Sequence, residues 1–225
     1  MSSDSHLDNR LGLCASFVRR GSRLADIGTD HAYLPVWLCR HGICPSAIAA
    51  DINPEPLRRG QMTIDAAHLG DRIKTRLSDG LSAIGEDEAD DIVIAGMGGE
   101  LIAKILGDCP YAKNPDKHLI LQPMTRSELL IRMLCANGFT IMRQDCCVAG
   151  NKCYTVLSVR FTGETAAPDE LYPYTGELRP WENDTHLRFL RGHIDRLRKQ
   201  ANGEARFGAL ADRLEAFCDN DPRHP

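Results

Sequence analysis

Two acidic residues flank a glycine near the start of the sequence, in the segment LADIGTDHAYLP, and could hold a small cation. Asp26 lies near the end of an apolar run, Gly28 follows two positions later, and Asp30 precedes a helix-forming stretch. The glycine permits a sharp turn and lets the backbone approach a ligand closely. A second apolar run ends in Asp51, 23 residues beyond Gly28, a spacing that suits a carboxylate bound to the hydroxyls of a ribose. The pattern predicts a site for a cofactor that contains adenosine.

The charge of this turn favours S-adenosylmethionine over a dinucleotide. In the dinucleotide fingerprint the position of Asp30 holds a glycine, which clears space for a pyrophosphate. A carboxylate there would repel a pyrophosphate and attract a cation. S-adenosylmethionine carries an adenosine, a sulfonium and an ammonium, so Asp26 and Asp30 suit it. Two alternatives stay open: a nicotinamide enzyme, or a strand-end acid and a helix N-cap that bind no ligand.

Alternating apolar runs and helix-forming stretches predict the elements that position these residues. Strands are expected at 23–27, 47–51, 73–77, 91–95 and 118–122, and helices at 5–18, 33–41, 53–68, 100–106 and 126–137. A hairpin of strands 139–148 and 152–161 follows. Strands that alternate with helices imply a parallel sheet covered on both faces. The predicted fold class is α/β, with the Rossmann-like, seven-stranded, mostly parallel sheet of class I methyltransferases and a small C-terminal helical domain.

A proline-containing segment divides the chain. Residues 163–180 show little periodicity and predict a linker between a cofactor-binding domain at 1–162 and a helical appendage at 181–218. Apolar residues recur at helical spacing from Leu187 to Leu197 and from Phe207 to Phe217, which predicts two helices in the appendage.

Basic residues gather in the appendage although the whole chain has a net charge of −4. Residues 186–213 carry seven Arg or Lys against three Asp or Glu, and such a local field steers a polyanion. The residues predicted to bind RNA are Arg126, Arg188, Arg191, Arg196 and Lys199. A solvated helix face or a dimer helix is the alternative.

Composition excludes several classes of protein. A chain of 225 residues with 43% hydrophobic content suits one soluble domain plus an appendage. No apolar run approaches the roughly 18 residues of a membrane span, and residues 1–5 show no signal-peptide pattern. The nine cysteines are expected to be reduced thiols in the cytoplasm, and the spacing of Cys146, Cys147 and Cys153 matches zinc sites poorly. We expect no metal, no membrane segment and a monomer, although no pattern fixes the oligomeric state.

The carboxyl ends of parallel strands meet at one edge of the sheet, where open α/β folds bind ligands. Asp79 could accept a hydrogen bond from the adenine amine, while Gly80 and Leu81 offer backbone groups and an apolar wall. The predicted cofactor-binding residues are Asp26, Gly28, Asp30, His31, Asp51, Ile52, Asp79, Gly80, Leu81, Ala95, Gly96 and Met97. Acids and glycines also occur at strand ends simply because chains turn there.

Five motifs together resemble the bacterial tRNA (adenine-22 N1)-methyltransferase family. They are DIGTDHAYLP, SDGL, IAGMGG, LILQP and GNKCY, and the resemblance covers about residues 7–159. It implies a class I methyltransferase domain followed by a coiled-coil-like helical domain, with S-adenosylmethionine as cofactor. It also implies methylation of N1 of an adenine in the D-arm of tRNA. Asp51 departs from the family, whose members often have glutamate there, so the ribose contact could differ in geometry. A class I methyltransferase that acts on a small molecule or a protein is the alternative.

Methylation at adenine N1 makes few demands on a protein. N1 has an in-plane lone pair and no proton to lose, so placing it in line with the methyl group could supply about 7–11 kcal/mol. The loop from Gly96 to Gly99 replaces the Pro-Pro loop that orients exocyclic amines in other methyltransferases. The predicted catalytic residues are His31, Tyr33 and Met97. Gly98 and Gly99 could expose amides to a phosphate, or form only a tight turn.

Overall fold

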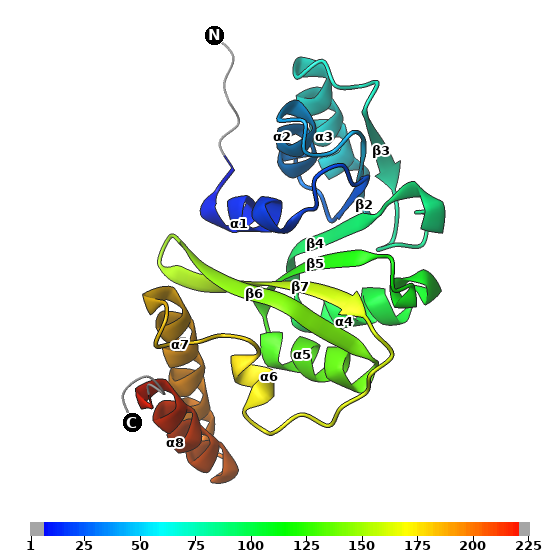
Figure 1. Cartoon of the computed structure of the whole chain (residues 1–225). Helices are drawn as coiled ribbons and strands as arrows, with labels where there is room; N and C mark the ends of the chain where they lie inside the picture. The colour runs from blue at the N-terminus through cyan, green and yellow to red at the C-terminus, as the bar shows by residue number, and fades with distance from the viewer. Residues whose placement is uncertain (1–6, 221–225) are drawn as a thin grey trace.

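A seven-stranded mixed sheet runs through the molecule in the order β3-β2-β1-β4-β5-β7-β6 (Figure 1). The computed structural model describes residues 7–220. The strands are β1 (Leu24–Ile27), β2 (Ala47–Asp51), β3 (Ile73–Leu77), β4 (Asp91–Gly98), β5 (His118–Thr125), β6 (Phe139–Ala149) and β7 (Lys152–Phe161). The first five are parallel, and β7 lies antiparallel between β5 and β6. The predicted fold class is confirmed.

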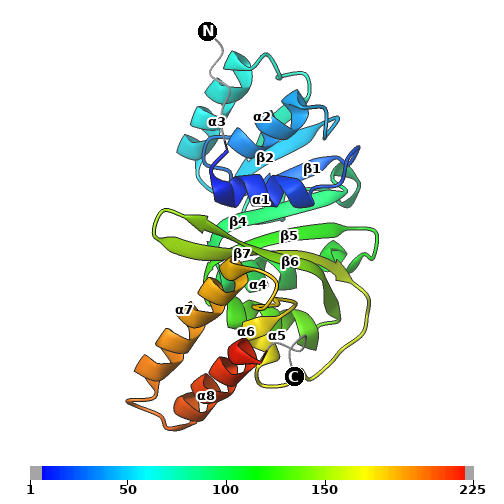
Figure 2. The same cartoon turned by 60° about the vertical axis from the view of Figure 1, so that its left-hand side comes forward.

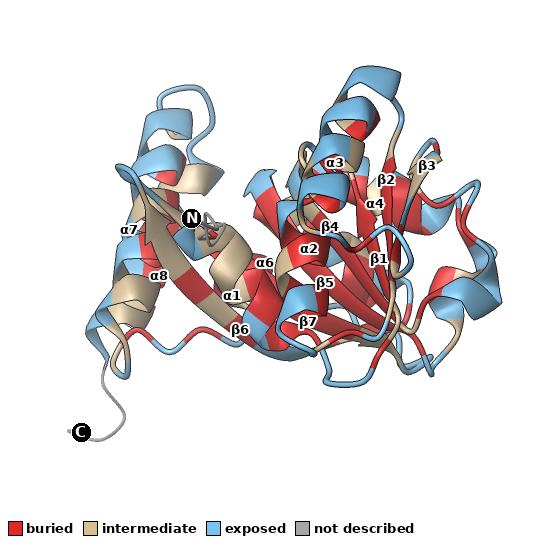
Figure 3. Cartoon of the chain, turned by 90° about the horizontal axis from the view of Figure 1, so that it is seen from above, coloured by how far each residue is buried: buried red, intermediate tan, exposed pale blue. Residues whose placement is uncertain are grey.

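Helices cover both faces of the sheet. They are α1 (Asn9–Phe17), α2 (Tyr33–Arg40), α3 (Pro54–Ala66), α4 (Gly99–Gly107), α5 (Ser127–Ala136), α6 (Tyr172–Thr175), α7 (Asp184–Gln200) and α8 (Arg206–Asp219). One apolar core joins α4 and α5 to one face, and a second core joins α1, α2 and α3 to the other. The central strands are buried on both faces (Figure 3), which is why they are continuous apolar runs. No helix within residues 7–220 is long and apolar enough to cross a membrane.

Two predicted boundaries differ in ways that shape the site. Strands β4 and β5 each run three residues beyond the predicted ends, because Met97 pairs with Pro123 and Gly98 with Thr125 across an irregular register. Helix α1 begins at Asn9 and not at residue 5, since the Asp8 carboxylate accepts a hydrogen bond from the Leu11 amide at 2.7 Å. Residues 5 and 6 of the predicted helix lie outside the described part of the chain.

The C-terminal helices form a hairpin beside the β6–β7 edge of the sheet (Figure 2). Helices α7 and α8 share an apolar core that includes Leu190, Leu197 and Leu214, and α7 also packs against β6 and β7. The predicted linker 163–180 is not free chain throughout. It contains α6, whose Pro173, Tyr174 and Thr175 are buried and which packs against α5. The sequence did not reveal α6 because four residues are too few to show a helical period.

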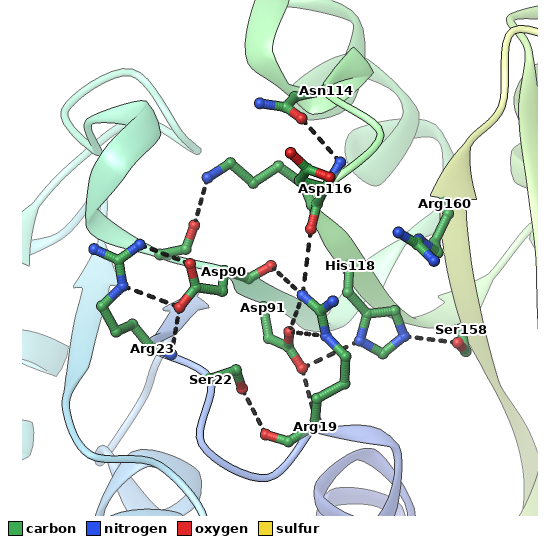
Figure 4. A network of polar contacts seen from close by, with 12 residues as sticks. Arg19, Ser22, Arg23, Asp90, Asp91, Asn114, Asp116, His118, Ser158 and Arg160 are labelled. Carbon is green, nitrogen blue, oxygen red and sulfur yellow. Dashed lines mark hydrogen bonds and ion pairs between the residues drawn. The ribbon is translucent and has the colours of Figure 1, made fainter.

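A buried polar network lies at the amino ends of β4 and β5, inner strands of the sheet (Figure 4). The Asp91 carboxylate accepts hydrogen bonds from the backbone amide and Nε of Arg19, both at 2.7 Å. Asp91 Oδ2 also lies 3.1 Å from His118 Nδ1, and His118 Nε2 lies 2.7 Å from Ser158 Oγ. Serine, histidine and aspartate stand in the order of a hydrolase triad. Ser158 is only 7% exposed, however, and Asp91 is shared with Arg19, so the network is a structural tie.

We expect Asp91→Ala to lower the free energy of unfolding by about 3 kcal/mol, because it leaves Arg19 and buried His118 without their acceptor. Urea denaturation followed by circular dichroism measures the change. Asp116→Ala is the matched control, since Asp116 is exposed beside the same network, and it should change stability by less than about 0.5 kcal/mol. Equal effects of the two substitutions would contradict the structural role of Asp91.

Candidate active site

A cleft opens where β1 and β4 end. Its cavity of about 380 Å³ lies between the start of α1, the β1–α2 turn and the end of β4. It brings together many of the predicted site residues, namely Asp26, Gly28, Asp30, His31, Tyr33, Ala95 and Gly96. The cleft therefore gathers acidic, aromatic and small residues from segments that lie far apart in the sequence.

Asp26 is the most buried charge in the cleft. It is 7% exposed and lies near the carboxyl end of β1, an inner strand of the sheet. Burial raises its pKa to about 6, a hydrogen bond from Thr29 opposes the rise, and the negative charge of Asp51 adds to it. A buried carboxylate is costly without a compensating partner, so the cleft favours a cationic ligand beside Asp26.

The β1–α2 turn needs small residues. Gly28 has φ +79°, and a side chain there would collide with the methyl group of Met97. Ala32 has φ 54°, in the left-handed region, and its amide donates to Thr29 Oγ1 at 3.2 Å. Left-handed backbone at a non-glycine residue is strained and occurs often at functional sites. Met97 at the end of β4 therefore lies against Gly28 of the β1–α2 turn, and the predicted site needs these two segments to be close together.

His31 and Tyr33 form a stacked pair at the mouth of the cleft. Their ring centroids lie 5.1 Å apart at an interplanar angle of 12°. Tyr33 is 44% exposed, so it does not serve the packing of α2. His31 Nε2 lies 3.5 Å from Asp30 Oδ2. The two rings offer a flat surface on which a base could stack.

The predicted adenosine-binding residues follow β2 and β3. Asp51 is half-buried and accepts a hydrogen bond from the Asn53 amide at 2.7 Å, whereas Ile52 is exposed. Asp79 and Leu81 line a second cavity of about 390 Å³, against α4. Leu81 is buried in the core, so its side chain contributes a wall. Of the twelve predicted cofactor residues, six thus line the cleft and two line the second cavity, while Asp51, Ile52, Gly80 and Met97 line neither.

Arg10 lines the cleft although the sequence analysis did not identify it, and buried Gln122 holds its side chain. Arg10 Nη1 donates to Gln122 Oε1 at 2.9 Å, and the Gly96 amide donates to the same oxygen at 3.1 Å. Gln122 is fully buried and joins β4 to β5. Arg10 therefore stands as a fixed cation in an acidic cleft, where a ligand carboxylate could meet it. Only contacts across 112 positions of sequence reveal this role.

A groove separates α7 from the end of β5 and the β6–β7 turn. Its cavity of about 810 Å³ is lined by Arg188, Arg191 and Arg196, among others. It shares Arg196, Met124 and Thr125 with a neighbouring cavity of about 280 Å³ that Arg126 also lines. Four of the five predicted RNA-binding residues therefore line one continuous depression. Lys199 is exposed on α7 outside the residues that line it.

Ion pairs divide the basic residues of the helical hairpin into two groups. Arg198 pairs with Asp212 and Glu215, Arg206 with Glu204, and Arg213 with Asp169 and Glu170. Within residues 7–220, no carboxylate pairs with Arg188, Arg191 or Lys199. The groove lining therefore has an excess of positive charge, with Lys152, Arg188, Arg191 and Arg196 against Asp184 and Asp195.

Gly99 serves packing at the start of α4. A side chain at Gly99 would collide with the carbonyl oxygen of Arg126, so the two helix starts can approach closely only with glycine. This contact accounts for Gly99 as a structural glycine, and the phosphate interpretation draws no support from it. In the part of the chain that the structure describes, no group of three or more His, Cys, Asp or Glu residues could hold a metal ion.

Comparison with known proteins shows the family of the chain. Residues 7–157 match the family described as Methyltransferase domain. The tRNA (adenine(22)-N(1))-methyltransferase of Bacillus subtilis (strain 168) is 30% identical over 224 residues, which cover 93% of this chain and 94% of that protein. The chain belongs to the tRNA (adenine(22)-N(1))-methyltransferase family.

Solved structures of similar proteins have the same fold over almost the whole chain. A putative tRNA (m1A22) methyltransferase of Streptococcus pneumoniae, in complex with S-adenosyl-L-methionine, is 30% identical with a TM-score of 0.85, covering 95% of this chain and 100% of that one. The M1A22 tRNA methyltransferase TrmK of B. subtilis is 27% identical with a TM-score of 0.81, covering 96% and 99%. Members of the tRNA (adenine(22)-N(1))-methyltransferase family thus share both the sheet and the helical hairpin.

We expect Asp26→Asn to stabilise the protein at pH 8 while it weakens cofactor binding. The pKa of Asp26 is higher in the folded protein than its ordinary value of 3.8. Its contribution to stability is therefore present below about pH 4 and is lost as the pH rises through about 6. Removing the charge should raise the free energy of unfolding at pH 8 by on the order of 1–3 kcal/mol. Urea denaturation at pH 5 and pH 8 measures this.

Calorimetry with S-adenosylhomocysteine measures the second effect, which should be a loss of about tenfold or more in affinity, because a charged hydrogen-bond acceptor is removed. Asp30→Asn is the matched control for stability, since the Asp30 side chain is 71% exposed and its charge costs little to keep hydrated. An Asp26→Asn protein with the stability profile and cofactor affinity of the unmodified chain would contradict the assignment.

Proposed function

We propose that this chain transfers a methyl group from S-adenosylmethionine to N1 of adenine 22 in the D-arm of tRNA. The observation that carries the proposal is the presence of two different surfaces at the ends of neighbouring strands. An acidic cleft with one fixed arginine lies at the strand ends, and an arginine-lined groove begins at the end of β5, the strand next to β4. Family membership supports the same reaction.

The residues of the cleft, together with the acids that follow β2 and β3, suit S-adenosylmethionine. Asp26 would face its positive charge, and Arg10 would bind its carboxylate. Asp51 would accept hydrogen bonds from the ribose, and Asp79 from the adenine amine. When bound, the cofactor supplies an electrophilic methyl group on a sulfonium. The donor set fits a zwitterion better than a pyrophosphate, for which Asp26 and Asp30 would be repulsive.

The protein would act on the target adenine by positioning it. N1 uses its in-plane lone pair to form the new bond, and no proton leaves, so no general base is needed. The stacked His31–Tyr33 pair would hold the base flat, and Gly96 beside Met97 leaves room for it at the end of β4. Such placement can contribute about 7–11 kcal/mol. The base must leave its stack, which costs a few kcal/mol.

The groove would hold the tRNA backbone. Proteins read A-form RNA largely through charge and shape, and Arg188, Arg191 and Lys199 on α7 have no ion pair with a carboxylate of the described chain. We therefore assign RNA binding to Arg188, Arg191, Arg196 and Lys199, and also to Arg126, whose ion pairs with Glu100 and Glu128 at 3.8 and 3.2 Å RNA would have to compete with. The helical hairpin at 181–218 would serve as an RNA-binding domain attached to the cofactor-binding domain at 1–162.

The reaction is tested with an unmodified tRNA transcript that carries adenine at position 22 and a matched transcript with guanine there. We expect methyl transfer from S-adenosylmethionine to the first transcript alone. Nucleoside mass spectrometry of the reacted tRNA should show 1-methyladenosine, and mapping should place it at position 22. Equal transfer to both transcripts would contradict the target, and transfer to neither would contradict the proposed function.

Arg191→Ala should weaken tRNA binding and reduce the salt dependence of the binding constant by about one phosphate contact. Arg198→Ala is the control on the same helix, because Arg198 is already paired with Asp212 and Glu215. It should leave the salt dependence unchanged. Filter binding at several salt concentrations measures both. The groove assignment is wrong if the two variants bind tRNA alike.

A further inference from the structure

A buried histidine stands at the joint between the helical hairpin and the methyltransferase domain. His193 on α7 is 1% exposed. Its ring meets Tyr174 of α6 at 5.3 Å and Phe189 at 4.9 Å, both nearly edge to face. His193 also lines the cavity of about 280 Å³ that Arg126 and Arg196 share.

Both ring nitrogens of His193 have partners. Arg196 Nη2 donates to His193 Nδ1 at 2.8 Å, and His193 Nε2 lies 3.4 Å from Ser127 Oγ. A guanidinium can only donate hydrogen bonds, so Nδ1 must be the acceptor and the proton must sit on Nε2, which points toward Ser127. Burial, together with the charge of Arg196, lowers the pKa of His193 to about 3. The ring is therefore neutral near pH 7 and keeps one tautomer.

Ser127 connects the histidine to a strained turn. It is the first residue of α5 and follows Arg126, whose φ of 56° lies in the left-handed region. On its other side this turn meets Gly99, where no side chain would fit against the Arg126 carbonyl. The turn that presents Arg126 to the cavity is thus held by Gly99 on one side and by Ser127 on the other.

Packing alone does not account for a histidine here. An apolar side chain of similar size would fill the space between Tyr174 and Phe189 without the cost of burying a polar ring. What histidine adds is an acceptor for Arg196 and a donor toward Ser127. Arg196 itself is exposed, and a long exposed side chain loses conformational freedom when it is held.

We propose that His193 is a positioning residue for RNA: Ser127 fixes its tautomer, and its Nδ1 holds the Arg196 guanidinium in one place, where it can face the tRNA backbone. Arg126, by contrast, is held by its own ion pairs with Glu100 and Glu128. This inference rests on the proposed function. His193 is buried, so it would act through Arg196 and not by touching RNA itself.

Two substitutions separate the contacts of His193. The amide oxygen of asparagine can occupy the position of Nδ1, whereas glutamine reaches the position of Nε2. His193→Asn should keep the acceptor for Arg196 and bind tRNA within about threefold of the unmodified chain. His193→Gln should lose it, weaken tRNA binding about tenfold and raise KM for tRNA similarly, with little change in kcat or in S-adenosylhomocysteine affinity. Equal tRNA affinities of the two variants would overturn the proposal.

A double-mutant cycle with Arg196→Ala tests whether His193 acts through the arginine. We expect the double variant His193→Gln with Arg196→Ala to bind tRNA no more weakly than Arg196→Ala alone. Additive losses overturn the inference but leave the proposed function intact. An Arg196→Ala variant with unchanged tRNA affinity overturns the groove as an RNA surface, and the inference with it.

Nitrogen NMR of the unmodified chain gives a readout that does not depend on whether a His193 variant folds. We expect His193 to show a bare Nδ1 and a protonated Nε2 at pH 7, and Arg196→Ala to shift the Nδ1 resonance. A proton on Nδ1, or an Nδ1 resonance that Arg196→Ala does not move, would overturn the proposal.

Discussion

The buried carboxylate of Asp26 is the constraint around which the active site is arranged. It lies near the carboxyl end of β1, where helices cover both faces of the sheet and little water remains to solvate its charge. The residues around it keep that charge tolerable and leave space beside it. Thr29 donates a hydrogen bond, Gly28 removes a side chain, and Ala32 turns the chain away in a strained conformation. A ligand with positive charge completes what the fold leaves unsatisfied.

The amino ends and the carboxyl ends of the parallel strands have opposite roles. At the amino ends of the strands, Asp91 is fully enclosed by Arg19 and His118, and the chain is tied together. At the carboxyl ends, Asp26 lies in an open cleft and the glycines keep side chains away. A carboxylate is buried at both ends. Asp91 is paired within the protein, whereas the partner of Asp26 would be a bound ligand. The amino ends of the strands thus stabilise the sheet, and the carboxyl ends form the binding surface.

The sequence predicted local features well and long-range contacts poorly. Strands β2 and β3 match their predicted bounds: β2 is an apolar run that ends in Asp51, and β3 lies between the polar turns at 70–72 and 78–80. The predicted ends of β4 and β5 were wrong, because a shift in register lets Met97 pair with Pro123 and Gly98 with Thr125. The acids of the cleft could be predicted, since strand ends of a parallel sheet converge. The role of Arg10 could not be predicted, because it depends on a hydrogen bond to Gln122, which is 112 positions away in the sequence.

The pairing of basic residues on the helical hairpin has a kinetic consequence. Arg198, Arg206 and Arg213 are neutralised by nearby acids, while Arg188 and Arg191 beside the groove are not. The hairpin is therefore electrically one-sided, and a polyanion that diffuses toward it is turned to the correct orientation before any contact forms. Such steering speeds encounter more than it prolongs residence, and dissolved salt screens it. An acidic protein can in this way capture a nucleic acid quickly and still release it.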